Sequence, residues 1–312
     1  MGNNRPGSAP VATPTIRSTR WIAAAVASVL VLTISYLSAV WTTRGQATEN
    51  AALRGADQVS EQDFSAASEA LGHITIATLA VAVILIALVG LVRRRPDLAI
   101  AGVAVIVLGQ VITQALKRFV LPRPELVEVS SNYTQNSFPS GHTTIAMTVL
   151  FAVFIVVPHR WRGIAALVVL TWAIGIGAYT TTAKWHRLSD TIGADAVALL
   201  CGCLAAWWLA RRGSLCHYQG GVRRGRVVYV VIVAALTSIS LALGAALWGI
   251  PHLRGTDLSI PDAAQDYTAY LGAHALAAGF SGLTALAFWA LWHRVDTTCR
   301  EAFAPMHSRA VN

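Results

Sequence analysis

Eight apolar runs, each close to the length that crosses a lipid bilayer, dominate this sequence. An α-helix needs about 20 predominantly apolar residues to span the hydrocarbon core. Runs of about that length lie at 21–41, 72–92, 98–116, 143–158, 163–183, 190–210, 227–250 and 268–292. The fourth is short, and the sixth carries Asp190 and Asp195 near its start. The sequence therefore predicts an all-α fold, a polytopic membrane helix bundle of about eight spans.

The composition excludes several other classes of protein. Of the 312 residues, 55% are hydrophobic and 12% are charged, whereas a soluble domain carries about 25% charged residues. Disordered chains and nucleic-acid-binding modules need low hydrophobicity or basic residues clustered on a solvated face. We therefore expect membrane lipids as surroundings and no nucleic acid as a partner. The four cysteines show neither a metal-ligand array nor a disulfide framework, so free thiols are expected.

The distribution of lysine and arginine predicts the topology, because cytoplasmic loops retain these residues. With the N-terminus inside, 16 of the 24 basic residues fall in inside segments and 12 of the 15 acidic residues fall outside. This pattern favours an N-in, C-in protein of the cell membrane, and the alanine-rich, lysine-poor composition is typical of a bacterium. The expected parts are a disordered cytoplasmic tail (1–16), a six-span core (17–210), a basic cytoplasmic loop (211–226), a two-span extension (227–292) and a cytoplasmic tail (293–312).

A group of cations opposes this general bias. They lie on the two loops that leave the third and fifth spans on the outer side: Lys117, Arg118, Arg123, Lys184 and Arg187. Cations held at the outer face against the topology rule indicate an anion that is bound there.

Three segments on that same side carry residues suited to phosphate chemistry. The first, 116–124, contains two prolines, so we expect a rigid, non-helical loop that holds its cations in place. The second, 137–144, places Pro, Ser and Gly before the fourth span, which is typical of a helix N-terminus that binds an anion. In the third, 184–190, His186 and Asp190 are four residues apart, so a helix would place the carboxylate beside the imidazole and leave one ring nitrogen free as a nucleophile.

Taken together, these segments resemble the membrane branch of the type-2 phosphatidic-acid phosphatase and vanadium haloperoxidase superfamily. The motifs of that family are K-x6-R-P, P-S-G-H and S-R-x5-H-x3-D. Here P-S-G-H is complete at 139–142 and H-x3-D is complete from His186 to Asp190. The resemblance covers residues 20–210 and implies a six-span core with these motifs at its outer face.

The resemblance also implies a site and a reaction. It assigns phosphate binding to four positions: Lys117, Arg123, Ser140 and Gly141. It makes His142 the acid, His186 the nucleophile and Asp190 the carboxylate that orients the nucleophile. The implied activity is hydrolysis of a lipid phosphate or polyprenyl pyrophosphate at the outer leaflet, through a phosphohistidine and with no metal or cofactor.

Two departures from the family motifs leave alternatives open. The first motif has five intervening residues in place of six, so its loop is drawn differently or Arg118 shares the work. Thr180 stands where the family has its third-motif arginine, and Lys184 and Arg187 are the nearby cations that could partly replace it. A weakened lipid-phosphate binding or transport protein, and a lipid phosphotransferase, remain the alternatives.

Other features lie outside the three segments. Residues 42–71 are interpreted as a polar, solvated connector, with a lid or gate as the alternative. The last two spans are expected to pack as an accessory pair or to mediate a homodimer. His274 is expected to form a hydrogen bond between helices. Four tryptophans at span ends are expected to be interfacial anchors: Trp21, Trp41, Trp161 and Trp292.

Overall fold

The structure, a computed structural model, describes residues 18–128, 135–221 and 224–298. Ten α-helices lie within these ranges: α1 Thr19–Val40, α2 Thr43–Gly55, α3 Glu61–Gly72, α4 Ile76–Val92, α5 Pro96–Ala115, α6 Gly141–Val156, α7 His159–Thr182, α8 Leu188–Arg211, α9 Arg224–Leu253 and α10 Ala263–Leu291. The shorter elements are the 3₁₀ turn η1 Ala56–Gln58, the π-helical turn η2 Leu116–Val120, and the antiparallel strands β1 Cys216–His217 and β2 Val295–Asp296. The predicted all-α bundle is confirmed, whereas the predicted tail 1–16 and most of 293–312 lie outside the described residues.

Each of the eight predicted runs is helical. Six helices are long and apolar enough to cross a membrane: α1, α5 extended by η2, α7, α8, α9 and α10. Helices α3 and α4 form a pair bent by 57°, which makes a seventh candidate if the pair is one span. Helix α6 has only 16 residues, as expected for the run that is short in the sequence.

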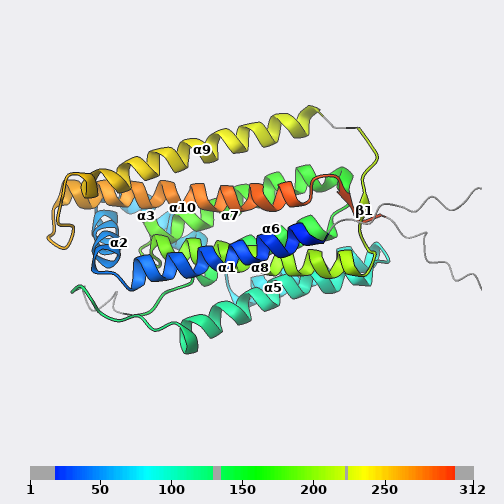
Figure 1. Ribbon diagram of the computed structural model, residues 1–312, viewed down its shortest axis with the longest axis horizontal. Helices are drawn as coiled ribbons and strands as arrows, with labels where there is room; N and C mark the ends of the chain where they lie inside the picture. Colours follow the sequence, from blue (N-terminus) through cyan, green and yellow to red (C-terminus); the bar gives the residue numbers. More distant parts are fainter. Residues whose placement is uncertain (1–17, 129–134, 222–223, 299–312) are drawn as a thin grey trace, which may run out of the picture.

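The long helices run side by side along the longest axis of the molecule (Figure 1). Helix α10 packs against α7 and α8 as well as against α9, so it is part of the central bundle. Helix α9 lies at the periphery against α10, and most of its apolar side chains are exposed. The last two spans are therefore unequal: α10 completes the core, and α9 covers α10.

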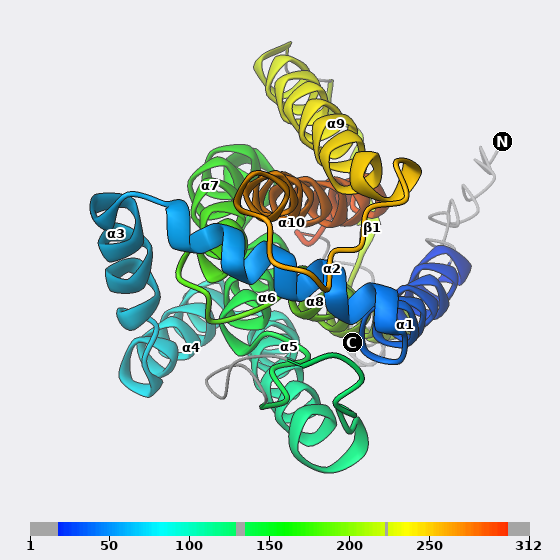
Figure 2. The same cartoon turned by 90° about the vertical axis from the view of Figure 1, so that its left-hand side faces the viewer.

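Residues 42–71 are not a solvated connector. They form α2, η1 and α3, and α2 lies across the ends of the long helices (Figure 2). Four polar side chains of α2 are buried, each with 2% of its surface exposed: Gln46, Thr48, Glu49 and Asn50. Polar residues are normally buried only when they find polar partners. The sequence interpretation failed here because those partners lie on distant segments.

Two other expectations about single residues need correction. Trp21 and Trp292 are not interfacial anchors, because both are buried and their rings stack edge to face with centroids 5.6 Å apart. Trp41 and Trp161 are exposed at helix ends, as expected. Cys216 is disulfide-bonded, whereas Cys201 and Cys203 are free. The expectation of free thiols is therefore wrong for Cys216, and Cys299 lies outside the described residues.

The segment 116–124 is non-helical only in its second half. Residues 116–120 continue α5 as the π-helical turn η2, and the extended loop begins at Leu121. Proline disfavours a helical conformation at the residue before it, which is Leu121 before Pro122, and has no such effect on earlier residues. The first-motif lysine therefore sits on a helix and its arginine on a loop.

Candidate active site

Three segments that are separated in sequence meet at one end of the bundle, which we call the histidine end: residues 117–123, 136–143 and 180–190, covered by α2. Ser140 connects two of them. Its backbone N–H donates to the carbonyl oxygen of Asp190 at 2.8 Å, and its Oγ accepts from the N–H of Thr143 at 3.3 Å, which caps α6. The second and third segments are thus fixed to each other through their backbones.

Close packing reinforces this junction. The buried ring of Phe138 lies against α8 at Gly193, where a Cβ atom would come within 2.6 Å of the ring. Glycine is required at 193 because any side chain there would push the segment before α6 away from α8.

Asn136 fastens the first segment to the second. Its Nδ2 donates to the carbonyl oxygens of Lys117 and Leu121, at 3.0 and 2.6 Å, and its Oδ1 accepts from the N–H of Phe138 at 3.2 Å. The sequence analysis missed this residue, because a single asparagine in a polar loop has no distinguishing pattern. Only its position just before the P-S-G-H motif could have indicated from the sequence that Asn136 belongs to the site.

The two histidines of the motifs lie next to each other. The ring centroids of His142 and His186 are 6.0 Å apart. The two ring planes are tilted by 57°, so a nitrogen of each ring can contact one phosphoryl group placed beside the pair. Trp185 packs its ring edge to face with His142, at 5.2 Å between centroids, and so limits the orientation of that imidazole. His142 Nδ1 has no hydrogen-bond partner among the described residues.

Asp190 lies beside His186, as the spacing of four residues predicts. Its Oδ2 lies 3.3 Å from Nδ1 of His186 and accepts from the backbone N–H of Arg187 at 2.9 Å. Asp190 is fully buried and lies in the first turn of α8, where the helix dipole favours a negative charge. With Nδ1 engaged by Asp190, Nε2 is the ring nitrogen that this carboxylate leaves free.

Two arginines are buried in the same cluster. The side chain of Arg123 is 5% exposed, and its Nη2 lies 3.8 Å from Oε2 of Glu49. Arg187 is 4% exposed; it donates to Oγ of Ser137 at 3.3 Å and to Oδ1 of Asn50 at 3.4 Å. Helix α2 therefore supplies polar partners to both guanidinium groups.

The remaining predicted cations divide into one that is close to the cluster and two that are not. Lys117 is partly buried and interacts electrostatically with Asp190 and His142. Arg118 is exposed on η2 and is not brought into the cluster. Lys184 forms an ion pair with Asp57 of η1, and its φ of 58° is the left-handed conformation that commonly ends a helix. Of the two basic substitutes considered for the missing arginine, the structure brings Arg187 into the cluster.

Thr180, at the position of that missing arginine, has a different role. Its Oγ1 donates to the carbonyl oxygen of Gly177 at 2.7 Å and lies 3.3 Å from Oγ1 of Thr191 on α8. Its carbonyl oxygen accepts from the N–H of Trp185 and of His186, at 3.0 and 3.1 Å. Thr180 thus shapes the turn that presents His186.

Glu49 is the second residue that sequence analysis missed. Its Oε1 accepts from the backbone N–H of Ser189 at 2.9 Å. Burial, together with the nearby charge of Asp190, raises the pKa of the Glu49 carboxyl above its usual value, and Arg123 and Arg187 oppose that shift. A carboxyl in α2 therefore lies directly behind the cations of the cluster.

His274 confirms a smaller expectation. Its Nδ1 lies 3.2 Å from Oγ1 of Thr182, so it joins α10 to α7 as an interhelical hydrogen bond. Oγ1 of Thr182 also lies 3.1 Å from the hydroxyl of Tyr270. These contacts place α10 directly behind the turn that carries His186.

The comparisons with known proteins agree with this geometry. A family model described as the PAP2 superfamily matches residues 98–214, which extend from α5 through α8 and contain the three motifs. This match confirms the resemblance that the motifs predict. No curated protein and no solved structure matches the chain significantly.

Proposed function

We propose, from the match of residues 98–214 to the model of the PAP2 (type-2 phosphatidic acid phosphatase) superfamily, that this membrane protein of phosphatase type hydrolyses a lipid phosphate or polyprenyl pyrophosphate. The observation that carries the proposal is the pair His142 and His186, whose ring centroids are 6.0 Å apart. Asp190 lies beside Nδ1 of His186. No single sequence motif contains both histidines. Two imidazoles on either side of one gap are what a double-displacement reaction at phosphorus requires.

In the first step, Nε2 of His186 attacks the phosphorus atom and forms an N–P bond while the bond from phosphorus to the leaving oxygen breaks. His142 donates a proton to that oxygen, and Asp190 stabilises the imidazolium charge on His186. In the second step, a water molecule attacks the phosphohistidine, and His142 accepts a proton from it. Phosphate leaves, and His186 returns to its neutral form.

The cations bind the phosphoryl oxygens during both steps. Lys117 and Arg123 come from the first segment, and Ser140 and Gly141 offer the capped N-terminus of α6. Arg187 supplies the planar guanidinium that the family carries at the position of Thr180. We therefore propose that the third-motif arginine of the family is replaced in this chain by Arg187, which lies at a different position and has the same chemical role.

A cavity of about 520 Å³ beside the cluster supports a lipid as the substrate. Its walls combine apolar side chains of α1, α8, α9 and α10 with polar side chains, among them Arg44 and Glu49 of α2 and His252 of α9. Leu188 and Ser189, which directly follow Arg187, form part of the wall. An acyl or prenyl chain in this cavity would lie next to the start of α8, which follows the turn that carries His186 and Arg187.

The distribution of basic residues favours the extracytoplasmic face of a bacterial cell membrane for the histidine end. A headgroup of the outer leaflet would lie at that level. Membrane lipids would then surround the bundle, and a homodimer is not required, because all the proposed groups come from one chain.

The experiment is a hydrolysis assay of purified protein in detergent. The panel contains phosphatidate, phosphatidylglycerol phosphate and a polyprenyl pyrophosphate, each with and without chelator. We expect His186→Ala to lower kcat by about 10⁴-fold or more, whereas His73→Ala, at the exposed histidine directly after α3, keeps full activity. Brief reaction with ³²P-labelled substrate should leave acid-labile label on His186.

Each result of this assay has a defined meaning. Normal hydrolysis by His186→Ala would refute the mechanism, and a requirement for a divalent metal would refute its metal independence. Binding without turnover on the whole panel would instead indicate the binding or transport alternative. Transfer of phosphate to an added alcohol in preference to water would identify a phosphotransferase.

A further inference from the structure

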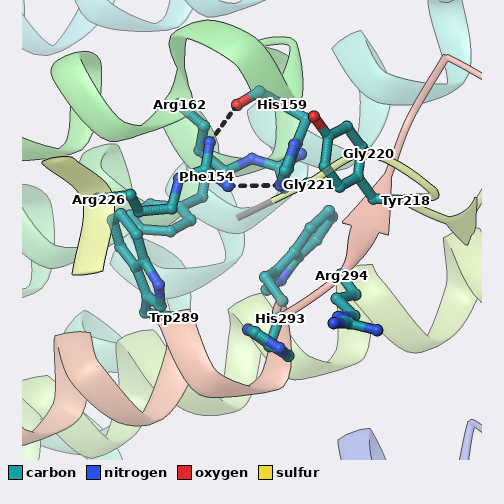
Figure 3. A pocket seen from close by; sticks show the side chains of 11 residues that line it. Phe154, His159, Arg162, Tyr218, Gly220, Gly221, Arg226, Trp289, His293 and Arg294 are labelled. Atoms are coloured by element: carbon teal, nitrogen blue, oxygen red, sulfur yellow. Dashed lines mark hydrogen bonds between the residues drawn. The ribbon is translucent and has the colours of Figure 1, made fainter. Parts of the chain in front are cut away.

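A second group of basic residues surrounds a small cavity at the opposite end of the bundle, which we call the arginine end. Helix α7 joins the two ends, and its 24 residues span about 36 Å. Five basic side chains line this cavity: His159, Arg162, Arg226, His293 and Arg294 (Figure 3). The other lining residues are aromatic residues and glycines, and none carries a carboxylate.

Arg162 is the buried cation of this cavity. It is 4% exposed, and Nη1 donates to the carbonyl oxygen of Val295 at 2.9 Å. Its Nε and Nη2 are buried and have no hydrogen-bond partner among the described residues. The guanidinium carbon lies 4.9 Å from the ring centroid of Trp292. A buried cation with two unpaired donors is costly unless an acceptor reaches it.

The neighbouring carboxylate does not fill this need. Asp296 is close enough to interact electrostatically with Arg162, but it lies outside the lining of the cavity. Its Oδ1 accepts from the backbone N–H groups of Thr297 and Thr298, at 2.6 and 3.2 Å. Within the described ranges, no ion pair joins Asp296 to Arg162.

A second guanidinium is held in place at the same cavity. Arg226 donates from Nη2 to the carbonyl oxygen of His159 at 2.8 Å, and its Nη1 lies 2.6 Å from Nε2 of that histidine (Figure 3). Both α7 and α9 begin here, at His159 and Arg224. The positive ends of two helix dipoles therefore add to the charge of the arginines.

The size of the cavity limits what can enter. The centre of a water molecule can reach about 50 Å³ of it, whereas a single water needs about 10–15 Å³ by this measure. That space accommodates one small tetrahedral anion and no acyl chain. Gly220 and Gly221 line the cavity and are exposed, as are His293 and Arg294, so these residues form its mouth.

We propose that this cavity binds one small oxyanion of phosphate chemistry, which accepts hydrogen bonds from Arg162 at its floor and is held by Arg226 and Arg294 nearer the mouth. The source is either free inorganic phosphate or the phosphate of a lipid headgroup at this face of the bundle. The proposal does not depend on hydrolysis at the histidine end, because the two cavities share no residue.

The test is equilibrium dialysis of the full chain in detergent with two probes, ³²P-labelled inorganic phosphate and labelled dihexanoyl phosphatidate. All proteins carry His186→Ala so that no probe is hydrolysed. Arg162→Met removes the charge with little change of volume, and Arg294→Ala alters only the exposed mouth. The matched control is Arg160→Met, an exposed arginine two residues from Arg162.

We expect Arg162→Met to weaken binding at one site by about tenfold or more, as for the loss of a charge-assisted contact. Arg294→Ala should weaken it several-fold, and Arg160→Met should leave it unchanged. Dependence on Arg162 with inorganic phosphate identifies the free anion, and dependence with the short lipid alone identifies a headgroup. If binding of both probes is unaffected by Arg162→Met and by Arg294→Ala, the proposal is wrong.

Discussion

The histidine end and the arginine end of this bundle both bury arginine, but they treat it differently. At the histidine end, Arg123 and Arg187 face the polar side chains of Glu49, Asn50 and Ser137, and one buried donor of Arg123, Nη1, has no hydrogen-bond partner among the described residues. At the arginine end, two donors of Arg162 have no partner among the described residues. The first arrangement surrounds its arginines with side chains of the chain itself, and the second offers Arg162 one backbone carbonyl and leaves two of its donors without an acceptor.

This difference in hydrogen bonding is consistent with a reaction at the histidine end and with ligand binding at the arginine end. A reaction requires groups that are already oriented when the substrate arrives, because reorganisation during the reaction lowers the rate. A binding site has no such requirement, since a bound anion can itself complete the hydrogen bonds. Changes to the polar contacts of the histidine end should therefore slow hydrolysis, whereas matched changes at exposed positions should not.

The largest effect is expected for Asp190→Asn. An amide in this position favours the wrong tautomer of His186 and cannot stabilise its positive charge, so kcat should fall by about 10³–10⁴-fold. The control is Asp195→Asn, one turn further along α8, where the carboxylate accepts from Ser281 and does not contact a histidine. Steady-state hydrolysis measures both variants, and a loss below about tenfold for Asp190→Asn would contradict an orienting role.

A smaller effect is expected for Arg187→Lys. Lysine keeps the charge but cannot reproduce the planar fork, so kcat/KM should fall by about 10²–10³-fold. Arg118→Lys, at an exposed position of η2, should show no comparable loss. Equal rates for Arg187→Lys and the original protein would show that Arg187 does not replace the missing third-motif arginine.

The buried carboxyl of Glu49 in α2 predicts that the stability of the protein depends on pH. Since burial raises the pKa of Glu49 above the usual 4.5, the folded state keeps the proton to higher pH than the unfolded state does. The free energy of unfolding should therefore fall as pH rises above 4.5, by up to about 1.4 kcal/mol per pH unit, until the pH passes the pKa of the folded state.

Glu49→Gln should remove the decline of the free energy of unfolding with rising pH. Glu61→Gln, at an exposed position of α3, should leave that decline unchanged. Thermal unfolding between pH 4 and pH 8 in detergent measures the difference. Parallel curves for Glu49→Gln and the original protein would show that Glu49 does not retain its proton on folding.

The smallest effect is expected where α2 is attached to α10. Arg54 forms a two-pronged ion pair with Asp266, with both distances at 2.8 Å, and also donates to the carbonyl oxygen of Leu258 at 2.9 Å. Arg54→Met should lower the free energy of unfolding by about 1–3 kcal/mol. Arg254→Met, at the exposed arginine directly after α9, should change the free energy of unfolding little. Equal stability of the two variants would mean that the ion pair does not hold α2 in place.

Much of this protein follows from the order of its residues. Bilayer thickness fixes the length of an apolar span, so the eight helical runs could be located without coordinates. The position of α6 followed from Pro139, Ser140 and Gly141 directly before an apolar run. The pairing of His186 with Asp190 followed from the pitch of a helix. These are local properties, and local properties are visible in a sequence.

The tertiary structure decided which distant groups meet. The partners of α2 lie on loops and helices far along the chain, so Glu49 and Asn50 read as solvated residues until the fold placed them beside Arg123 and Arg187. The same holds for Trp21, whose stacking partner is Trp292, and for Thr180, whose hydroxyl lies against Thr191. Burial and pairing depend on contacts between remote segments, and only the folded chain establishes those contacts.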